Sequence, residues 1–200
     1  MNPREAIAQS ESHEDLVESV IRLFGYRSYL EIGCQDDFTF SRIDVPKKVG
    51  VDPTRGGTLR MTSDTYFMTH VDMFDCIFID GNHHHDQVIK DAHNALKSLR
   101  PGGTLLMHDC APPNAVHEDQ NLCGTAWRAF AVLRQQPSLD AIVADWDYGT
   151  GIIRMRNNPA PIVLGKSFEE LTWNDFIENR HKWMRPHTPP QVLAWLETFL

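Results

Sequence analysis

Two short apolar runs, each ending in polar residues, organise the centre of the chain. The first run covers 76–79 and stops at Asp80, and the second covers 104–107 and stops at His108 and Asp109. Short apolar runs that end in turn or polar residues are typical of strands buried on both faces of a parallel sheet. The pattern therefore predicts two central strands whose ends carry polar side chains.

A helix-length segment separates these two runs. Its apolar positions recur with helical spacing, and a Pro-Gly-Gly breaker at 101–103 follows it. The residues expected on the buried face are Val88, Ala92, Leu96 and Leu99. Strand, helix and strand in this order form a βαβ unit, and its right-handed crossover places both strand ends at one edge of the sheet. Asp80, His83, His108 and Asp109 are therefore expected at one crevice, the usual place for a ligand in such sheets.

The rest of the chain continues the alternation of strands and helices. Further strands are predicted over 28–33, 47–51, 59–62, 139–144 and 151–155, and helices over 4–24, 34–43, 63–70 and 125–136. Ser12 is expected to cap the first helix and Gly25 to end it. We predict an α/β fold with a Rossmann-like, doubly wound sheet of about seven strands, mostly parallel with an antiparallel last strand.

The proline-rich C-terminal segment differs from the rest. Residues 1–156 are expected to form the main domain, and 157–200 a helical appendage packed on it. Within the main domain, the loop 111–124 after Asp109 is long enough to form a lid over the crevice, with His117 on it. Tyr148 and Trp146 are expected at the border of the substrate pocket.

Composition narrows the possible partners. The 200 residues carry a formal charge of −8, which argues against nucleic acid, a ligand that favours a basic face. No apolar stretch reaches the roughly 18 residues needed to cross a bilayer, and no signal peptide is visible at the N-terminus. The four cysteines form no CxxC pair, so reduced thiols and a cytoplasmic location are expected.

The turn after the first predicted strand provides the first candidate site. SYLEIGCQDD places Gly33 where the backbone can approach a ligand closely, and Asp52 ends the next strand. The stretch resembles the first motif of the class I S-adenosylmethionine-dependent methyltransferases, although Cys34 and the residues after it depart from that glycine-rich pattern. The resemblance implies bound S-adenosylmethionine. The cofactor-binding residues it implies are Glu31, Gly33, Cys34, Asp52, Ser63, Asp64 and Asp80.

The central stretch carries a second resemblance. IDGNHHHD, LRPGGTLLMHD and the spacing between them resemble the small O-methyltransferase branch of the same superfamily. This resemblance implies transfer of a methyl group to a hydroxyl of a small molecule, a sugar or another polar metabolite. It also makes His83, which occupies the family's IDGxH position, the preferred histidine of the three; His84 and His85 are expected to be solvated.

A hydroxyl needs help to lose its proton, and two routes are open. A divalent cation lowers the pKa of a bound hydroxyl, and Asp80, His108 and Asp109 are suitable ligands for Mg²⁺ or Mn²⁺. Alternatively, His83 or His108 acts as general base. The expected catalytic residues are His83, His108 and Asp109.

Three other functions stay open. A nicotinamide-dependent oxidoreductase shares the fold, but the GxGxxG motif after the first strand is missing. A metal-dependent hydrolase would use the histidine-rich cluster, and a non-catalytic interaction protein would need no site at all. Whether the chain forms a homo-oligomer is open as well.

Overall fold

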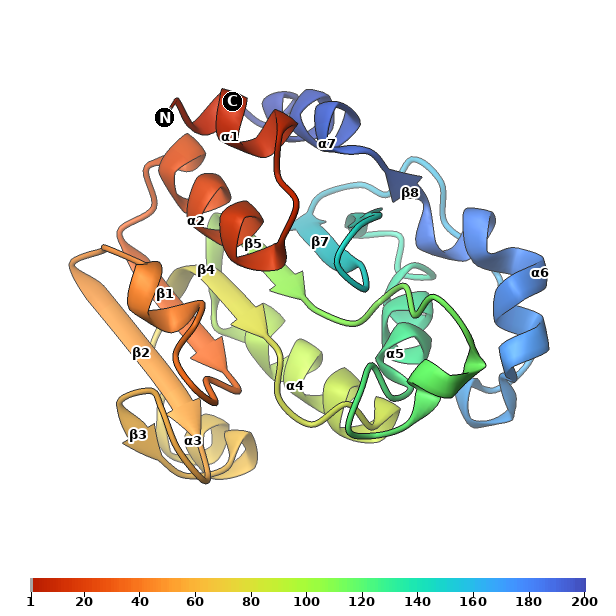
Figure 1. The fold of residues 1–200 in the computed structure, drawn as a ribbon, viewed down its shortest axis with the longest axis horizontal. Helices are drawn as coiled ribbons and strands as arrows, with labels where there is room; N and C mark the ends of the chain where they lie inside the picture. Colours follow the sequence, from red (N-terminus) through yellow and green to blue (C-terminus); the bar gives the residue numbers. More distant parts are fainter. Residues whose placement is uncertain (1) are drawn as a thin grey trace.

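One mixed sheet runs through the molecule (Figure 1). The computed structural model describes residues 2–200, and the strands follow the order β3-β2-β1-β4-β5-β7-β6-β8. Strands β3, β2, β1, β4 and β5 are parallel, and β7 lies antiparallel between β5 and β6. The strand bounds are β1 Ser28–Ile32, β2 Lys47–Asp52, β3 Leu59–Arg60, β4 Phe74–Ile79, β5 Leu99–Met107, β6 Leu139–Ala144, β7 Thr150–Met155 and β8 Pro186–His187. The predicted Rossmann-like fold is confirmed.

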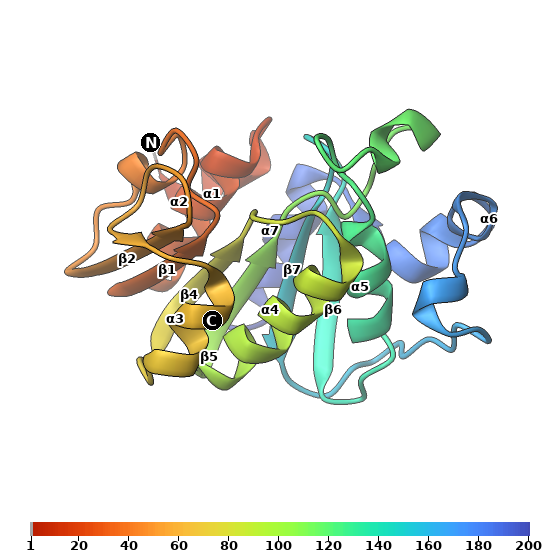
Figure 2. The same cartoon turned by 90° about the horizontal axis from the view of Figure 1, so that it is seen from below.

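Helices cover both faces of the sheet. The helices are α1 Pro3–Ala8, α2 His13–Phe24, α3 Ser63–Thr69, α4 His85–Lys97, α5 Ala126–Leu133, α6 Trp173–Met184 and α7 Pro189–Glu197. Figures 1 and 2 show α1, α2 and α7 on one face and α3, α4 and α5 on the other. Successive strand residues point to opposite faces, so Leu30 joins the core under α4 and α5 while Tyr29 joins the core under α2.

The N-terminal segment forms two helices, where one over 4–24 was predicted. The chain leaves the helical conformation after Ala8 and re-enters it at His13. Ser12 caps α2, because its side chain accepts a hydrogen bond from the backbone N–H of Asp15 at 3.3 Å. Gly25 ends α2 in the left-handed conformation, as predicted. The break matters because it sets His13 at the first turn of α2, beside the crevice.

Two other boundaries were predicted wrongly. The Arg-Pro-Gly-Gly segment does not precede β5 but lies within it: Leu99 already pairs with Phe74 of β4, and the register shifts before Thr104 pairs with Cys76. Leu99 therefore packs as a strand residue, not on the helix. The predicted helix over 34–43 is only the single 3-10 turn Phe40–Arg42, so most of this segment is loop around the ligand edge.

The C-terminal segment adds a strand that the sequence pattern did not predict. β8 pairs in parallel with β6, opposite Val143 and Ala144. Asp140 in β6 is completely buried and accepts from Arg156 and Arg185, each at 2.7 Å. The segment after residue 156 thus packs against the sheet through α6, β8 and α7. Across residues 2–200, no helix is both long enough and apolar enough to cross a membrane.

Candidate active site

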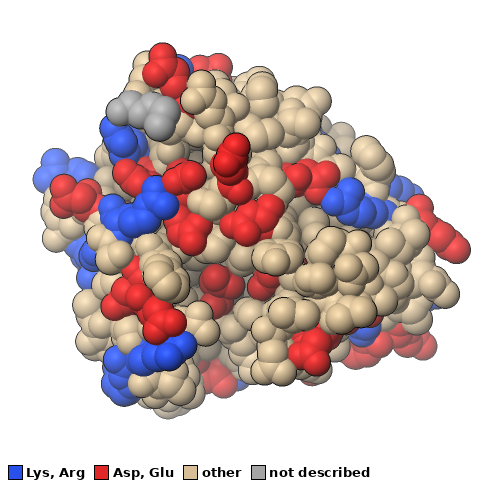
Figure 3. Space-filling model, viewed as in Figure 1, with Lys and Arg blue, Asp and Glu red and all other residues tan. Residues whose placement is uncertain are grey.

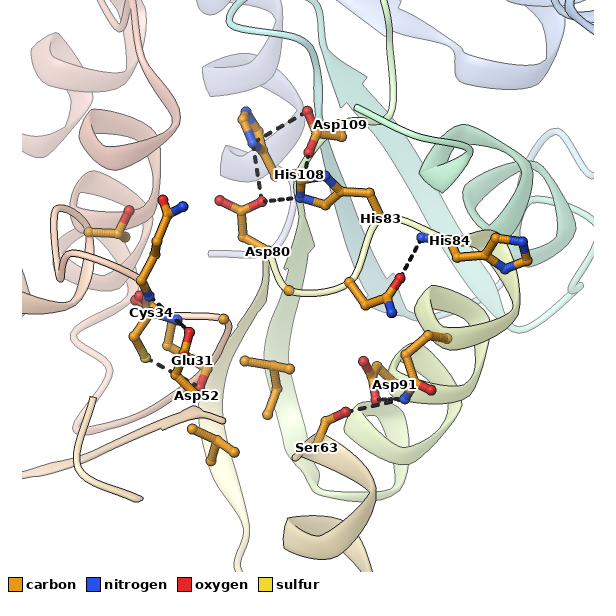
Figure 4. Close-up of a pocket in the computed structure, with 18 of the residues that line it drawn as sticks. Glu31, Cys34, Asp52, Ser63, Asp80, His83, His84, Asp91, His108 and Asp109 are labelled. Atoms are coloured by element: carbon orange, nitrogen blue, oxygen red, sulfur yellow. Dashed lines mark hydrogen bonds and ion pairs between the residues drawn. The ribbon is translucent and has the colours of Figure 1, made fainter. Parts of the chain in front are cut away.

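A cavity of about 1090 Å³ opens at the carboxyl ends of the parallel strands. The residues expected to be catalytic, cofactor-binding or metal-binding all contribute to its wall: Glu31, Gly33, Cys34, Asp52, Ser63, Asp64, Asp80, His83, His108 and Asp109. In Figure 4, Glu31, Cys34 and Asp52 lie on one side of the cavity, and Asp80, His83, His108 and Asp109 lie together on another. The cavity therefore has two chemically different sides.

Gly33 allows the ends of β1 and β4 to meet. Its φ angle is +85°, and a Cβ atom at this position would lie 2.1 Å from the carbonyl oxygen of Asp80. A side chain is therefore excluded both by the backbone conformation and by the neighbouring strand. The absence of a side chain therefore lets the backbone of Asp80 and Gly81 pack directly against this turn.

Asp52 holds the loops that follow β1 and β2. One carboxylate oxygen accepts from the backbone N–H groups of Cys34 at 3.1 Å and Gln35 at 3.0 Å. The other accepts from the N–H groups of Thr54 at 2.8 Å and Arg55 at 2.9 Å. Burial alone would raise the pKa of Asp52, but these donors lower the pKa to about 2. The carboxylate is ionised, and it fixes the shape of the cavity wall.

Glu31 is the buried acid of this side. Its side chain is 2% exposed and accepts a hydrogen bond from the Tyr29 hydroxyl. Burial raises the pKa of Glu31 to about 8, and the negative charge of Asp80 acts in the same direction. Near neutral pH the group is therefore largely protonated, and it can donate a hydrogen bond into the cavity.

Ser63 and Asp64 lie at the start of α3, where they contact α4. The Gln87 side chain donates to Ser63 at 3.2 Å, Asp64 at 3.1 Å and Asp91 at 3.0 Å. Asp91 is a buried cavity residue that the sequence pattern did not single out, and burial raises its pKa to about 6. In the sequence, Asp91 follows Lys90 in a predicted helix, so nothing distinguishes it from a solvent-exposed acid.

His83 lies between two carboxylates. Its Nε2 atom is 3.3 Å from an oxygen of Asp109 and 3.7 Å from an oxygen of Asp80. Burial by itself would lower the pKa of His83, but the two carboxylates raise it. Burial also raises the pKa of Asp109, against the opposing effect of His108. A proton can thus be shared among these groups.

His108 is held from both sides of its ring. Nε2 donates to the backbone carbonyl of Asp147 at 2.7 Å, while Nδ1 lies 3.5 Å from Asp80 and 3.7 Å from Asp109. Burial opposes the charged form, but Asp80, Asp109 and the Asp147 carbonyl together raise the pKa of His108 to about 10. The same contact holds the pKa of Asp80 well below its usual range, although burial opposes it. His108 is therefore an imidazolium near neutral pH, and it cannot accept another proton.

Two residues beside His108 were missed in the sequence. His13 Nδ1 lies 2.6 Å from a carboxylate oxygen of Asp147, and the His13 backbone N–H donates to the same oxygen at 2.8 Å. The rings of His13 and His108 approach to 4.1 Å between centroids. His13 and Asp147 are 134 residues apart, so no local pattern could indicate that they meet.

His84 and His85 differ from each other. His84 caps α4 and is half-exposed. His85 was expected to be solvated, but it is 8% exposed: its Nδ1 lies 2.8 Å from the Thr125 hydroxyl, and its ring packs edge-on against Phe168. The first helical turn points His85 inward at α5, away from the cavity.

The 111–124 segment covers one end of the cavity. His117, Gln120, Leu122 and Cys123 lie on the cavity wall, as does Tyr148 from the turn before β7. His117 and Tyr148 face each other with ring centroids 5.5 Å apart. Trp146 instead packs against the core under α2 and is not among the residues that line the cavity. The end of the segment is fixed, because the Thr125 backbone N–H donates to the His83 carbonyl at 2.9 Å.

Comparison with known proteins shows a family similarity in the central part of the chain. Residues 41–110 match the model of a family described as a methyltransferase domain. That range runs from the loop after β1 to the end of β5, and it includes Asp52, Asp80, His83, His108 and Asp109. Residues 41–110 are therefore similar to a methyltransferase domain.

Solved methyltransferase structures share the fold of this chain at low sequence identity. SAH-bound methyltransferase PaMTH1 of Podospora anserina is 18% identical, covers 72% of this chain and 78% of its own, and has a TM-score of 0.57. An O-methyltransferase of Bacillus cereus in complex with SAH is 14% identical, covers 78% and 91%, and has a TM-score of 0.55. No curated protein matches the chain. At these identities the structures support the fold, and the chemistry must come from the site itself.

The site includes a set of side chains that suits a divalent cation. Donor atoms of Asp80, His83 and Asp109 all lie within 4.8 Å of one another. Two carboxylates and one imidazole match the preference of Mn²⁺ and, with more oxygen ligands from water, of Mg²⁺. The metal-binding set expected from the sequence, Asp80, His108 and Asp109, stays a prediction. His108 also belongs to a group with His13 and Asp80 whose donor atoms lie within 4.8 Å of one another.

Proposed function

We propose that this methyltransferase domain transfers the methyl group of S-adenosylmethionine to a hydroxyl of a small polar acceptor, a sugar or a similar hydroxylated metabolite. The observation that carries the proposal is the two-sided cavity. A glycine turn and loop amides form one side, and a carboxylate–imidazole cluster able to take a proton forms the other.

The first side fits the cofactor. Gly33 lets the ends of β1 and β4 meet at this edge, because a Cβ atom there would clash with the Asp80 carbonyl, and Asp52 holds the amides of Cys34 and Gln35 in place. Glu31, Ser63 and Asp64 lie around the same part of the wall and would contact the ribose and adenine. Bound S-adenosylmethionine would supply an electrophilic methyl carbon on a sulfonium, and the protein would orient the acceptor oxygen opposite the leaving sulfur.

The second side fits proton removal. We assign the role of base to His83, paired with Asp109, because His83 faces the cavity and its proton can pass to a neighbouring carboxylate. His108 would act as a fixed imidazolium that keeps Asp80 ionised. If the domain uses a metal, Asp80, His83 and Asp109 would hold it, and the cation would lower the pKa of the acceptor hydroxyl.

The four cysteines support a cytoplasmic location for this activity. Cys34, Cys76, Cys110 and Cys123 are all free and buried. Burial raises the pKa of each thiol well above its usual value, so these groups stay protonated and unreactive. A reducing compartment suits such a chain.

Calorimetry tests the cofactor part directly. The protein should bind S-adenosylmethionine and its demethylated product S-adenosylhomocysteine, and Asp52→Ala should weaken both because the loop amides lose their common acceptor. A mass-based screen for an added methyl group then tests transfer. Tight zinc, hydrolytic activity and no nucleotide binding would instead identify a hydrolase. If turnover is unchanged in EDTA, metal assistance is excluded and His83 remains the candidate base.

A further inference from the structure

The cavity wall is rich in acids but, among the described residues 2–200, includes no Lys or Arg. Carboxylates from several parts of the chain reach it, including α2, β1, β2 and the ends of β4 and β5. Figure 3 shows the same distribution from outside: Asp and Glu gather round the central hollow of this face, and Lys and Arg lie farther out. Such a wall favours neutral and cationic ligands.

Three cations on the cofactor side of the cavity are paired with acids, and Arg128 of α5 lies 3.6 Å from Glu118 of the 111–124 segment. Lys90 Nζ lies 2.6 Å from Asp64, and Arg60 lies 3.8 Å from Asp52. Arg55 pairs with Asp36 at 3.1 Å. All three cations belong to the side where the cofactor would bind. None of them faces the cluster of Asp80, His83 and Asp109.

The acceptor side has its own balance of charge. His83 Nε2 lies 3.3 Å from Asp109, and His108 lies 3.5 Å from Asp80 and 2.7 Å from the Asp147 carbonyl, so these imidazoles already have partners within the protein. Glu14 adds another carboxylate to the wall, with only His13 Nε2 near it at 3.6 Å. A phosphate or carboxylate that entered here would lose its hydration and find no guanidinium or ammonium group in return. Burial of an unpaired charge is costly.

We propose that the acceptor of this domain carries no anionic group. This inference rests on the proposed methyltransferase function. The substrate class is a hydroxylated molecule that is neutral or bears an ammonium group. Sugar phosphates, nucleotide sugars, acyl-CoA esters and carboxylic acids are excluded, because the wall selects against them by unpaired charge and by repulsion from the acids.

Two matched series of probes test the proposal. One series is methyl glucoside, glucosamine and glucuronic acid; the other is 4-methylcatechol, dopamine and 3,4-dihydroxybenzoic acid. Binding to the protein saturated with S-adenosylhomocysteine is measured by saturation-transfer NMR, and turnover with S-adenosylmethionine by mass shift. In the series that binds, we expect the affinity for the carboxylic acid to be lower than the affinity for its neutral partner by about tenfold or more.

The outcomes separate this inference from the proposed function. If S-adenosylhomocysteine itself does not bind, the methyltransferase function fails. If it binds and an acid equals or exceeds its neutral partner in binding or turnover, only the acceptor inference is overturned. Binding of none of the six probes also counts against the inference, since both neutral hydroxylated scaffolds would then be rejected.

A designed cation sharpens the test. Gln120 is exposed on the 111–124 segment and lines the cavity, so Gln120→Arg should improve the binding of the acid relative to its neutral partner by about threefold or more. Ala115→Arg adds the same charge to an exposed position of the same segment that does not line the cavity, and should leave the ratio unchanged. Equal effects of the two variants would show that the wall does not select by charge.

Discussion

The two sides of the cavity use carboxylates in opposite ways. On the cofactor side, Asp52 is saturated with backbone N–H donors, and its pKa falls to about 2 although burial opposes ionisation. On the acceptor side, Asp80 and Asp109 face the imidazoles of His83 and His108 at 3.3–3.7 Å. The first arrangement keeps Asp52 ionised. The second allows a proton to move between a carboxylate and an imidazole.

The difference shows where this fold can tolerate change. A carboxylate bound by amides of two loops acts on geometry, so its replacement should disturb binding. A carboxylate paired with an imidazole acts on protonation, so its replacement should disturb turnover and its pH dependence. The predictions below separate these two kinds of effect.

Gly33→Ala should give the largest loss on the cofactor side. The new Cβ atom would lie 2.1 Å from the Asp80 carbonyl, so β1 and β4 must separate at the cavity edge. A misplacement of about 1 Å can cost on the order of 100-fold in rate, and we expect turnover to fall by about this factor. Affinity for S-adenosylhomocysteine, measured by calorimetry, should fall as well.

Gly102→Ala provides the matched control for this variant. Gly102 also has a positive φ, +78°, but no atom would lie within 4 Å of a Cβ at this position. It should lose about 1–2 kcal/mol of stability from backbone strain alone and bind the cofactor normally. If both variants bind alike, the close approach of β1 and β4 does not shape the cofactor site.

Asp109→Asn should damage the acceptor side selectively. The amide cannot take up a proton from His83, which lies 3.3 Å from the native carboxylate. Turnover should fall by about 10²–10⁴-fold, the usual contribution of general base catalysis. Affinity for S-adenosylhomocysteine, measured by calorimetry, should stay nearly constant. If the variant loses as much cofactor affinity as turnover, Asp109 contributes to cofactor binding and not selectively to proton removal.

His108→Gln should change how stability depends on pH. The folded-state pKa of His108 is raised from 6.5 to about 10, so its charge stabilises the fold fully below about pH 6.5 and loses that effect as pH rises toward 10. The wild-type protein should therefore lose stability by a few kcal/mol over this window, and the variant should lose less. Urea unfolding from pH 6 to pH 10 measures both slopes. Parallel slopes would mean that His108 is not charged in the folded protein.

Local patterns were enough to predict the sheet and the residues at its strand ends. The apolar runs before Asp80 and His108 identified two central strands, and parallel topology then required their ends to meet. The boundary at 99–103 was wrong because strand pairing with β4 overrides the breaker residues. Position 103 of this strand has room only for glycine, because a Cβ atom there would lie 2.7 Å from the Asp75 carbonyl.

Contacts between distant segments could not be predicted in this way. His13 reaches Asp147 and His108 only because α2 packs on the sheet with its first turn at the cavity. The effect of burial is also invisible in a sequence: Glu31 and Asp91 read as ordinary acids, whereas burial raises the pKa of Glu31 to about 8 and of Asp91 to about 6. The sequence identifies the ionisable groups, but their pKa values depend on burial and on neighbours from distant segments.

Lys90→Ala should have the smallest effect of these variants on stability and on cofactor affinity. Lys90 and Asp64 form an ion pair at 2.6 Å, but their side chains are 54% and 45% exposed. An exposed pair contributes about 0–1 kcal/mol, so thermal unfolding and cofactor affinity should scarcely change. Gln87→Ala is the comparison, because Gln87 joins Ser63, Asp64 and Asp91 across α3 and α4. It should weaken cofactor binding more than Lys90→Ala does, and the reverse order would mean that the α3–α4 contact is held by charge and not by this amide.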